Sequence, residues 1–489
     1  MAGLSASPAL GFTNFELGAQ PLGTPGQTCP AGGSAEQQCW NYAAEPAIRS
    51  DPGGNFYASS ENGLGGGTDA WKSPRPANGQ SYTYLGMPDG GTTQTANSGF
   101  APGGGDTDLA VAPVQNGSGN YNVYVASLSL ANVDVSTSID GGKTFSLHPI
   151  GATVPGDDRE WIAADGSSKV CTSYHDVATY NIDVNCSMDA GATFSQLGEA
   201  IDPQHAYLIE NNEIGNLAID PSNHNVYQVL NGIGSQDVAC STAGTCGYHV
   251  VYMAVSTDGG RTFTDHQVYA GPPTDSYNHN FTNVSVDRAG NVYAVYSDNH
   301  RVYMSYSTDQ GASWHGPYVV SSTPAATAIY PWSTAGDPGR LAVVYYGSSY
   351  YDGTNPPDNY PASAQWHAYY AENDNVLSNP GKFTQVEASP VNHTGAVCEG
   401  GVSCTGNRDL YDDFGVAVSP VTNAASVVYS DDQFGGTNNP PPSGCTAATN
   451  NSGTCDHTNV ATGSSSLFAL SGAGGKTKSS ATGGKTKRR

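Results

Sequence analysis

The chain has little charge, and most of that charge is of one sign. Only 12% of its 489 residues are charged, and 18 Lys and Arg stand against 43 Asp and Glu, which gives a formal net charge of −25. A body this acidic repels nucleic acid and anionic membrane surfaces, because both are polyanions. The sequence therefore predicts that the protein has no nucleic-acid partner.

Long hydrophobic runs and zinc-binding spacings are also lacking. No window holds the roughly 18 to 20 apolar residues that a membrane-spanning helix requires, so no membrane span is expected. None of the ten cysteines forms a Cys-x-x-Cys pair, which argues against a zinc site. The sequence predicts no required cofactor.

The cysteines instead form five pairs that are local in sequence. An even number of neighbouring cysteines indicates loop-closing disulfides and an oxidising compartment. We therefore expect a monomer that is secreted or displayed at the cell surface. The pairs are Cys29 with Cys39, Cys171 with Cys186, Cys240 with Cys246, Cys398 with Cys404, and Cys445 with Cys455.

A fourfold repeat runs through the middle of the chain. Its common form is Ser-x-Asp-x-Gly-x-Thr/Ser-aromatic, which suits a hairpin tip: Asp accepts from turn amides, Gly permits positive φ, and the aromatic returns to a buried face. Successive copies are about 50 to 70 residues apart, the length of a four-stranded propeller blade with loop insertions. We interpret the Asp residues as structural rather than catalytic: Asp140, Asp189, Asp258 and Asp309.

Each repeat follows an apolar strand and then a strand of alternating Tyr and Val residues. We call this pair of strands an opening, and it also recurs at places without a repeat. Seven openings, near residues 45, 106, 160, 213, 280, 330 and 413, predict an all-β fold: a single β-propeller of four-stranded antiparallel blades. Seven blades are favoured, and six result if the first and last segments share a blade. The predicted organisation is a lead-in at 1–43 able to add an edge strand, the propeller at 44–470, and a flexible basic tail at 471–489.

The residues that open the innermost strands should share one face around the central axis. Most are acidic, so the ring could hold a cation, supply carboxylates for acid–base chemistry, or hydrate the mouth of the channel. One hypothesis is a Ca²⁺ ion at Glu160, Glu213 and Asp413. The ring consists of Glu45, Asp106 or Asp108, Glu160, Glu213, Asn280, Tyr330 and Asp413.

The repeat resembles the Asp-box, also called the bacterial neuraminidase repeat, of the sialidase superfamily. Segments 158–163, 335–340, 393–404 and 408–414 also look like those of bacterial secreted proteins of that family, and the resemblance covers most of residues 45 to 470. It implies a propeller whose Asp-boxes lie far from the active site. It also implies a secreted, sialidase-like glycoside hydrolase that acts on extracellular carbohydrate or glycoprotein.

Sialidases bind the substrate carboxylate with three arginines, attack with a tyrosine that a glutamate activates, and use an aspartate as acid and base. Carried onto this chain, the resemblance implies an anion clamp, a nucleophile, its base and a proton donor. In that order the candidates are Arg159, Arg340 and Arg408; Tyr411 or Tyr330; Glu213; and Asp157 or Asp413.

Two other functions remain open from the sequence. The Phe/Tyr-Arg-Ile-Pro motif of sialidases is missing, and in the nearest segment, residues 46–50, the proline precedes the arginine. This departure favours a non-catalytic propeller that binds a glycan, a protein or a cell surface. A carbohydrate lyase is the third reading, with His205, His279 or His393 as its base.

Overall fold

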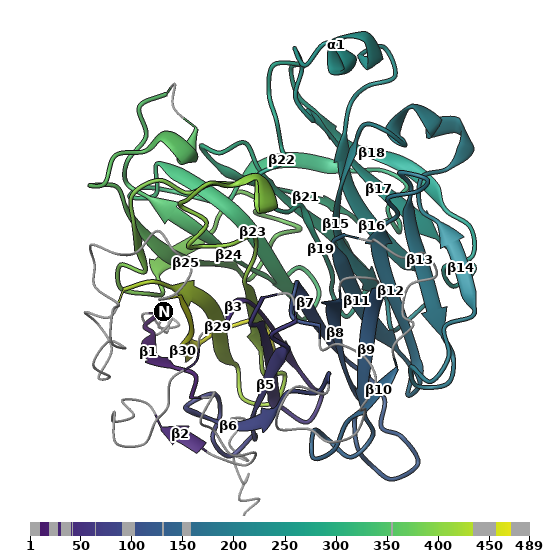
Figure 1. Ribbon diagram of the computed structural model, residues 1–489, viewed down its shortest axis with the longest axis vertical. Helices are drawn as coiled ribbons and strands as arrows, with labels where there is room; N and C mark the ends of the chain where they lie inside the picture. The colour runs from purple at the N-terminus through teal and green to yellow at the C-terminus, as the bar shows by residue number, and fades with distance from the viewer. Residues whose placement is uncertain are drawn as a thin grey trace, which may run out of the picture.

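Seven antiparallel sheets follow one another around a ring in the computed structural model (Figure 1). The structure describes residues 10–18, 28–30, 41, 43–63, 65–89, 103–129, 132–148, 158–353, 356–433 and 456–470. The innermost strands each contact the next, and the last contacts the first. They are β3 (Ala44–Ser50), β7 (Thr107–Val111), β11 (Glu160–Asp165), β15 (Asn212–Ile219), β19 (Asn283–Val286), β23 (Thr327–Ala335) and β28 (Gly415–Val418).

Each blade continues outward through a second, a third and an outer strand. The second strands are β4 (Phe56–Glu61), β8 (Val123–Ser129), β12 (Lys169–His175), β16 (Val226–Gly232), β20 (Val292–Ser297), β24 (Leu341–Ser348) and β29 (Ala424–Asp431). The third strands are β5 (Thr68–Ser73), β9 (Asn132–Ser138), β13 (Ile182–Ser187), β17 (Val250–Ser256), β21 (Val302–Ser307), β25 (Gln365–Asn373) and β30 (His457–Ser464). The outer strands are β6 (Ser81–Gly86), β10 (Ser146–His148), β14 (Gln196–Glu199), β18 (Thr264–Ala270), β22 (His315–Val319), β26 (Thr384–Glu387) and β1 (Thr13–Glu16).

Little else is regular. Two short strands, β2 (Thr28–Pro30) and β27 (His393–Thr394), pair with β6 and β25. The helices described are α1 (Val238–Thr242) and the 3-10 turns Pro203–Leu208, Pro357–Asn359 and Gly401–Ser403. Among the residues that the structure describes, no helix is both long enough and apolar enough to cross a membrane.

The predicted all-β propeller is confirmed with seven blades, and the six-blade alternative is wrong. The segments that open near residues 45 and 413 begin two separate blades, because a strand from the lead-in closes the ring instead. That strand, β1, pairs antiparallel with β30 from Thr13 opposite Thr462 to Glu16 opposite Asn459. In Figure 1 the purple β1 lies beside β30 and β29 of the last blade.

The apolar cores lie between successive blades. One core joins Ala126 and Val135 of the second blade to Ile162 and Val170 of the third. The core at the closure joins Phe15 of β1 to Trp71 and Val428, from the first and last blades. Each blade is therefore stabilised mainly by its two neighbours, as burial of apolar area requires when every sheet has two covered faces.

Because the strands alternate in direction, the ring has two distinct ends. We call the end where the innermost strands begin the start face. The hairpins between third and outer strands lie at the opposite end, the turn face, and these hairpins contain the four repeats. In one repeat, Asp258 accepts from the hydroxyl of Ser256 (2.7 Å) and from the amide and hydroxyl of Thr262 (3.0 and 2.7 Å). Asp140, Asp189 and Asp309 are bonded in the same way.

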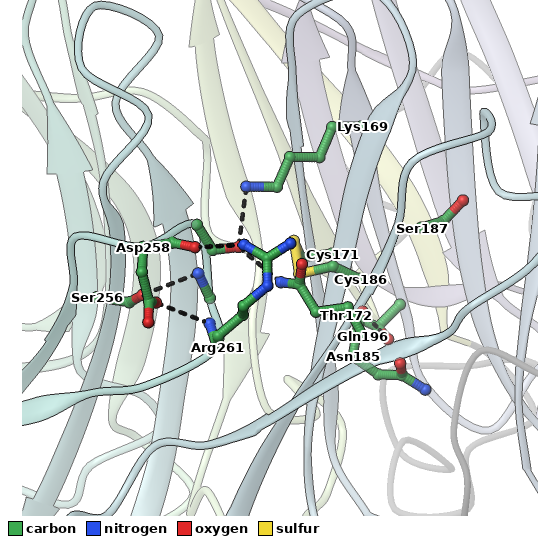
Figure 2. Close-up of a disulfide and its surroundings, with 12 residues drawn as sticks. Lys169, Cys171, Thr172, Asn185, Cys186, Ser187, Gln196, Ser256, Asp258 and Arg261 are labelled. Atoms are coloured by element: carbon green, nitrogen blue, oxygen red, sulfur yellow. Dashed lines mark hydrogen bonds between the residues drawn. A yellow bond between two sulfur atoms is a disulfide. The ribbon is translucent and has the colours of Figure 1, made fainter.

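The repeat turns also fasten neighbouring blades. Lys169 of the third blade donates to the carbonyl of Gly259 in the turn of the fourth (3.1 Å), and Gln196 donates to the same carbonyl (2.8 Å) (Figure 2). Behind this contact, a disulfide joins Cys171 and Cys186 across β12 and β13. Lys72 of the first blade likewise donates to the carbonyl of Gly141 in the turn of the second, and Asn225 of the fourth blade donates to the side-chain oxygen of Gln310 in the turn of the fifth.

Two other predicted disulfides form among the described residues. Cys240 pairs with Cys246 and Cys398 pairs with Cys404, each across six residues. The remaining two predicted pairs, Cys29 with Cys39 and Cys445 with Cys455, lie wholly or partly outside the described residues.

Substituting Gly260 tests the contact between blades three and four. Gly260 has φ +96°, and a Cβ there would lie 3.2 Å from the Cys186 sulfur. Gly119→Ala is the matched control, because Gly119 has φ +79° and no neighbour within 4 Å of its Cβ position. We expect both alanines to lower the free energy of unfolding by about 1–2 kcal/mol, and Gly260→Ala to cost about 1 kcal/mol more. Equal losses in urea unfolding would contradict this contact.

Candidate functional site

The start face carries a backbone that is bent where the innermost strands begin. Glu45, Asn280 and Tyr330 have left-handed φ values of 48°, 25° and 55°. Bulges interrupt the pairing of β3 around Glu45 and of β23 around Tyr330. Such conformations cost energy for residues other than glycine and cluster where side chains must be aimed at a ligand. The strain marks this ring as the candidate site.

Arg159 lies at the centre of the ring. Its guanidinium pairs with carboxylates from three other blades: Glu45 at 3.0 Å, Asp106 at 3.2 Å and Asp413 at 2.5 Å. The side chain is only 5% exposed. A buried guanidinium is stable only when it is paired and desolvation is offset, so these three carboxylates and Arg159 depend on one another.

Aromatic rings meet across the axis beneath this cluster. Trp161 lies 5.6 Å from Phe281 and 5.3 Å from Trp332, centroid to centroid, and all three are buried. The guanidinium of the central arginine lies over Trp161 at 4.5 Å, and that of Arg49 lies over Trp332 at 4.7 Å while pairing with Asp108. These cation–π contacts hold the two arginines against the aromatic rings, which form a floor to the acidic cluster.

A second arginine, Arg408, shares the carboxylate of Glu45 with Arg159. Arg408 pairs with Glu45 at 3.1 Å and with Asp412 at 2.8 Å, and its guanidinium lies 5.4 Å from the ring of Tyr411. Burial alone would raise the pKa of Asp106, but the charge of Arg159 and the carboxyl of Glu45 hold it below its usual value. The arginines of the ring are therefore already neutralised by protein carboxylates.

Asp158 and Glu213, two carboxyl groups at the start face, take no part in these ion pairs and reach solvent. Asp158 is exposed and Glu213 is half-buried. Although the Asp158 side chain reaches solvent, its partial burial and the nearby Asp106 raise the pKa of this carboxyl group to about 7. Burial and the charge of Asp158 raise the pKa of Glu213 to about 7, although Asn278 donates to it at 3.4 Å. The site thus offers two interacting carboxyl groups, each able to hold or release a proton near neutral pH.

A disulfide-closed loop contributes the opposite wall. Glu399, within the loop that Cys398 and Cys404 close, pairs with the imidazole of His279 at 3.0 Å. Burial lowers the pKa of His279, but the charge of Glu399 outweighs it and raises this pKa above its usual value. The side chain of Asn280 donates to the carbonyl of Glu399, which ties the loop to the start of β19.

Glu160 and Tyr330 are buried more deeply. Both carboxyl oxygens of Glu160 and the hydroxyl of Tyr330 have no hydrogen-bond partner among the described residues, and neither side chain is more than 1% exposed. Burial, reinforced by the charge of Asp106, raises the pKa of Glu160 well above its usual value. Glu160 therefore favours the protonated, neutral form.

The structure brings together most of the predicted site residues. Arg159, Arg408, Tyr411, Glu213, Asp413 and Tyr330 all lie on the start face. Arg340 does not, because it lies in the hairpin between β23 and β24 on the turn face, where it donates to the carbonyl of Ser466. The three-arginine clamp is therefore not formed. Asp157 lies outside the described residues.

The predicted metal ligands do not form a compact group. Two clusters of the described residues have ligand atoms all within 4.8 Å of one another, and neither contains Glu160, Glu213 or Asp413. Of the three candidate lyase bases, His279 is at the ring, whereas His205 and His393 belong to those two clusters.

Sequence reasoning missed four acidic residues of this site. Asp158 and Asp412 are neighbours of predicted residues, and Asp158, Glu399 and Asp412 entered the sequence analysis only within the resembling segments 158–163, 393–404 and 408–414. Glu61 ends β4 and Glu399 lies in a loop, so both reach the site through strand pairing or the disulfide rather than through the openings. For Asp158 and Asp412, the available signal was an acidic residue directly beside the opening.

Comparisons with known proteins found neighbours in structure but not in sequence. No family model and no curated protein matches the chain, so the resemblance to the Asp-box sialidases remains a prediction. The fold is similar to a GH74 xyloglucanase from Xanthomonas campestris, with TM-score 0.47 and 14% identity over 83% of this chain and 52% of that one. It is also similar to a GH93 α-L-arabinofuranosidase of Fusarium graminearum, with TM-score 0.42 and 15% identity over 69% and 93% of the two chains. A third is the NanB sialidase from Streptococcus pneumoniae, with TM-score 0.38 and 10% identity over 84% and 68%.

Replacing Arg159 tests the central ion pairs. Arg159→Met should lower the free energy of unfolding by about 3–5 kcal/mol, because it leaves buried Asp106 and Asp413 without their cation and Glu45 with Arg408 alone. The loss should shrink as the pH falls and those carboxyls become protonated. Arg288→Met removes an exposed pair with Asp337 and should cost about 0–1 kcal/mol. Urea unfolding at pH 5 and pH 8 compares the two, and similar small losses would disprove the central role of Arg159.

The raised pKa of Glu213 predicts the sign of a pH effect on stability. The unfolded chain releases this proton near pH 4 and the folded chain near pH 7, so Glu213 costs stability progressively as the pH rises through that window. We expect Glu213→Gln to match the wild type at pH 4 and to unfold at a higher temperature at pH 8.

Asp258 provides a control in which the pKa shift, and therefore the effect on stability, has the opposite sign. Burial would raise its pKa, but hydrogen bonds from Thr262 and Ser256 hold that pKa well below the usual range. Asp258→Asn should therefore lower the unfolding temperature at pH 8. A Glu213→Gln variant that is less stable than wild type at pH 8 contradicts the assignment.

Proposed function

We propose that this protein is a glycoside hydrolase that acts on uncharged glycans at the start face, with Asp158 and Glu213 as its reacting carboxyl groups. The observation that carries the proposal is their combination of solvent access, mutual electrostatic influence and a pKa near 7 in a ring of otherwise paired charges.

Glycoside hydrolysis needs this pair of protonation states. One carboxyl group gives its proton to the leaving glycosidic oxygen, and the other, as a carboxylate, removes a proton from the attacking water or itself attacks the sugar. When two interacting acids both titrate near pH 7, the singly protonated pair is most populated between their two apparent pKa values. The activity should therefore have a bell-shaped pH dependence.

The charges around the pair favour an uncharged sugar over sialic acid. A sialic acid carboxylate needs an available cation, but Arg159 already meets three carboxylates and Arg408 meets two. The third predicted arginine, Arg340, is at the other end of the propeller. The proposal therefore keeps the glycosidase part of the sequence prediction and changes the sugar.

Three disulfides and an acidic surface support an extracellular setting. There the substrate would be a polysaccharide or glycoprotein outside the cell that makes the enzyme.

A panel of chromogenic glycosides and soluble polysaccharides tests the proposal. We expect turnover of at least one neutral glycoside, no turnover of a sialoside, and a bell-shaped rate profile. Asp158→Asn and Glu213→Gln should each lower kcat about 100-fold or more, and each should remove one limb of the profile.

Asp134→Asn is the matched control. Burial raises the pKa of Asp134 to about 7 as well, but this residue lies in β9, the third strand of its blade, away from the ring. Its substitution should leave kcat unchanged. Retention of a glycan without turnover would replace the proposal by the binding function, and preferential release of sialic acid would restore the sialidase prediction.

A further inference from the structure

Two aspartates clasp the third and fourth blades at their outer edge. The amide of Asp202 donates to the carboxylate of Asp265 at 2.8 Å, and the amide of Asp265 donates to the carboxylate of Asp202 at 2.9 Å. Asp202 follows β14 and Asp265 lies in β18, so the clasp joins the outer strands of neighbouring blades. Two buried carboxylates are thereby held face to face.

A histidine completes the group. Nδ1 of His205 lies 3.0 Å from Asp202 Oδ1 and 3.6 Å from Asp265 Oδ2. Asp202 also caps the 3-10 turn that carries the histidine, by accepting from the amides of Gln204 and His205. The backbone of the turn is therefore fixed, and the three ligand atoms lie within 4.8 Å of one another.

One oxygen of the clasp has no donor. Asp265 Oδ1 is buried without a hydrogen-bond partner among the described residues, and its side chain is 0% exposed. Leaving a buried carboxylate oxygen unpaired is costly, and a cation held by both oxygens of Asp265 would remove that cost.

The other compact cluster does not suit an ion. In it, His393 donates from one ring nitrogen to Asp432 at 2.7 Å and from the other to the carbonyl of Ala396 at 2.9 Å. Two acceptors require the protonated imidazole, which cannot bind a metal. His393 is also buried, whereas His205 is 25% exposed, so solvent and ions reach only the first cluster from the side of its histidine.

We propose that Asp202, His205 and Asp265 bind one divalent transition-metal ion, with Zn²⁺ as the preferred species. Ligand atoms about 2.0–2.2 Å from such an ion lie about 3.0–3.6 Å apart at tetrahedral or octahedral angles, which matches the two distances to Nδ1. Imidazole with carboxylates suits Zn²⁺, whereas Ca²⁺ prefers six or more oxygen ligands. Binding through Nδ1 requires the imidazole to carry its proton on Nε2, and water from the exposed side completes the coordination.

The ion would lock blade three to blade four and fix the segment that leads into β15. Because Glu213 lies near the start of β15, this site would stabilise one wall of the start face without taking part in its chemistry.

Metal binding by the full-length, tag-free protein tests the proposal. After treatment with chelator and gel filtration, wild type should bind one equivalent of Zn²⁺, measured by mass spectrometry of the eluted metal, and should unfold at a higher temperature with ZnCl₂. His205→Asn should weaken binding about 100-fold and abolish the thermal shift. Asp265→Asn should do the same.

His224→Asn and His393→Asn are the controls. His224 makes a single pair with Asp165 at 2.8 Å on a largely exposed side chain, so its loss should leave zinc binding intact. Failure of wild type to bind below millimolar zinc overturns the proposal. Binding that survives in His205→Asn, or that is lost in His393→Asn, places the ion elsewhere and also overturns it. Because His205 is partly exposed, its variant should fold even where Asp265→Asn does not.

Discussion

The buried guanidinium of Arg159 is the constraint on which the rest of the molecule depends. It belongs to the third blade, and its three carboxylate partners belong to the first, second and seventh. A charge this deep is tolerable only when all its partners arrive together. Four of the seven innermost strands must therefore reach the axis at the same level. The ring cannot close without also assembling this site.

The two faces use carboxylates in opposite ways. On the turn face, the aspartates of the repeats are saturated by hydrogen bonds, and Thr262 and Ser256 hold the pKa of Asp258 low against the effect of burial. On the start face, burial and like charges raise the pKa of Asp158 and Glu213 into the neutral range. Hydrogen-bonded aspartates therefore stabilise the turns at one end of the propeller, whereas carboxyl groups that titrate near neutral pH gather at the other.

The sequence predicted the architecture well because blades repeat. The four Asp turns gave the period, and the Tyr/Val strands placed the seven openings, from which the acidic ring followed. The lead-in was expected to be able to add an edge strand, but the blade that β1 joins was not predicted, because four residues in a Gly- and Pro-rich segment carry no repeat signal. Arg340 was misplaced for a different reason: a motif does not say at which end of a hairpin it lies, and this one follows β23 rather than precedes it. Asp158 was overlooked because its importance comes from solvent access and from its neighbours in space.

The two tryptophans beside the acidic ring give the molecule an optical property. Trp161 and Trp332 are two of only six tryptophans, they lie 5.3 Å apart, and a guanidinium lies over each. Indole emission responds to nearby charge and to the polarity of its surroundings. Whatever settles on the acidic ring, or protonates it, changes the field at these two rings, so their fluorescence reports occupancy of the site without any added label.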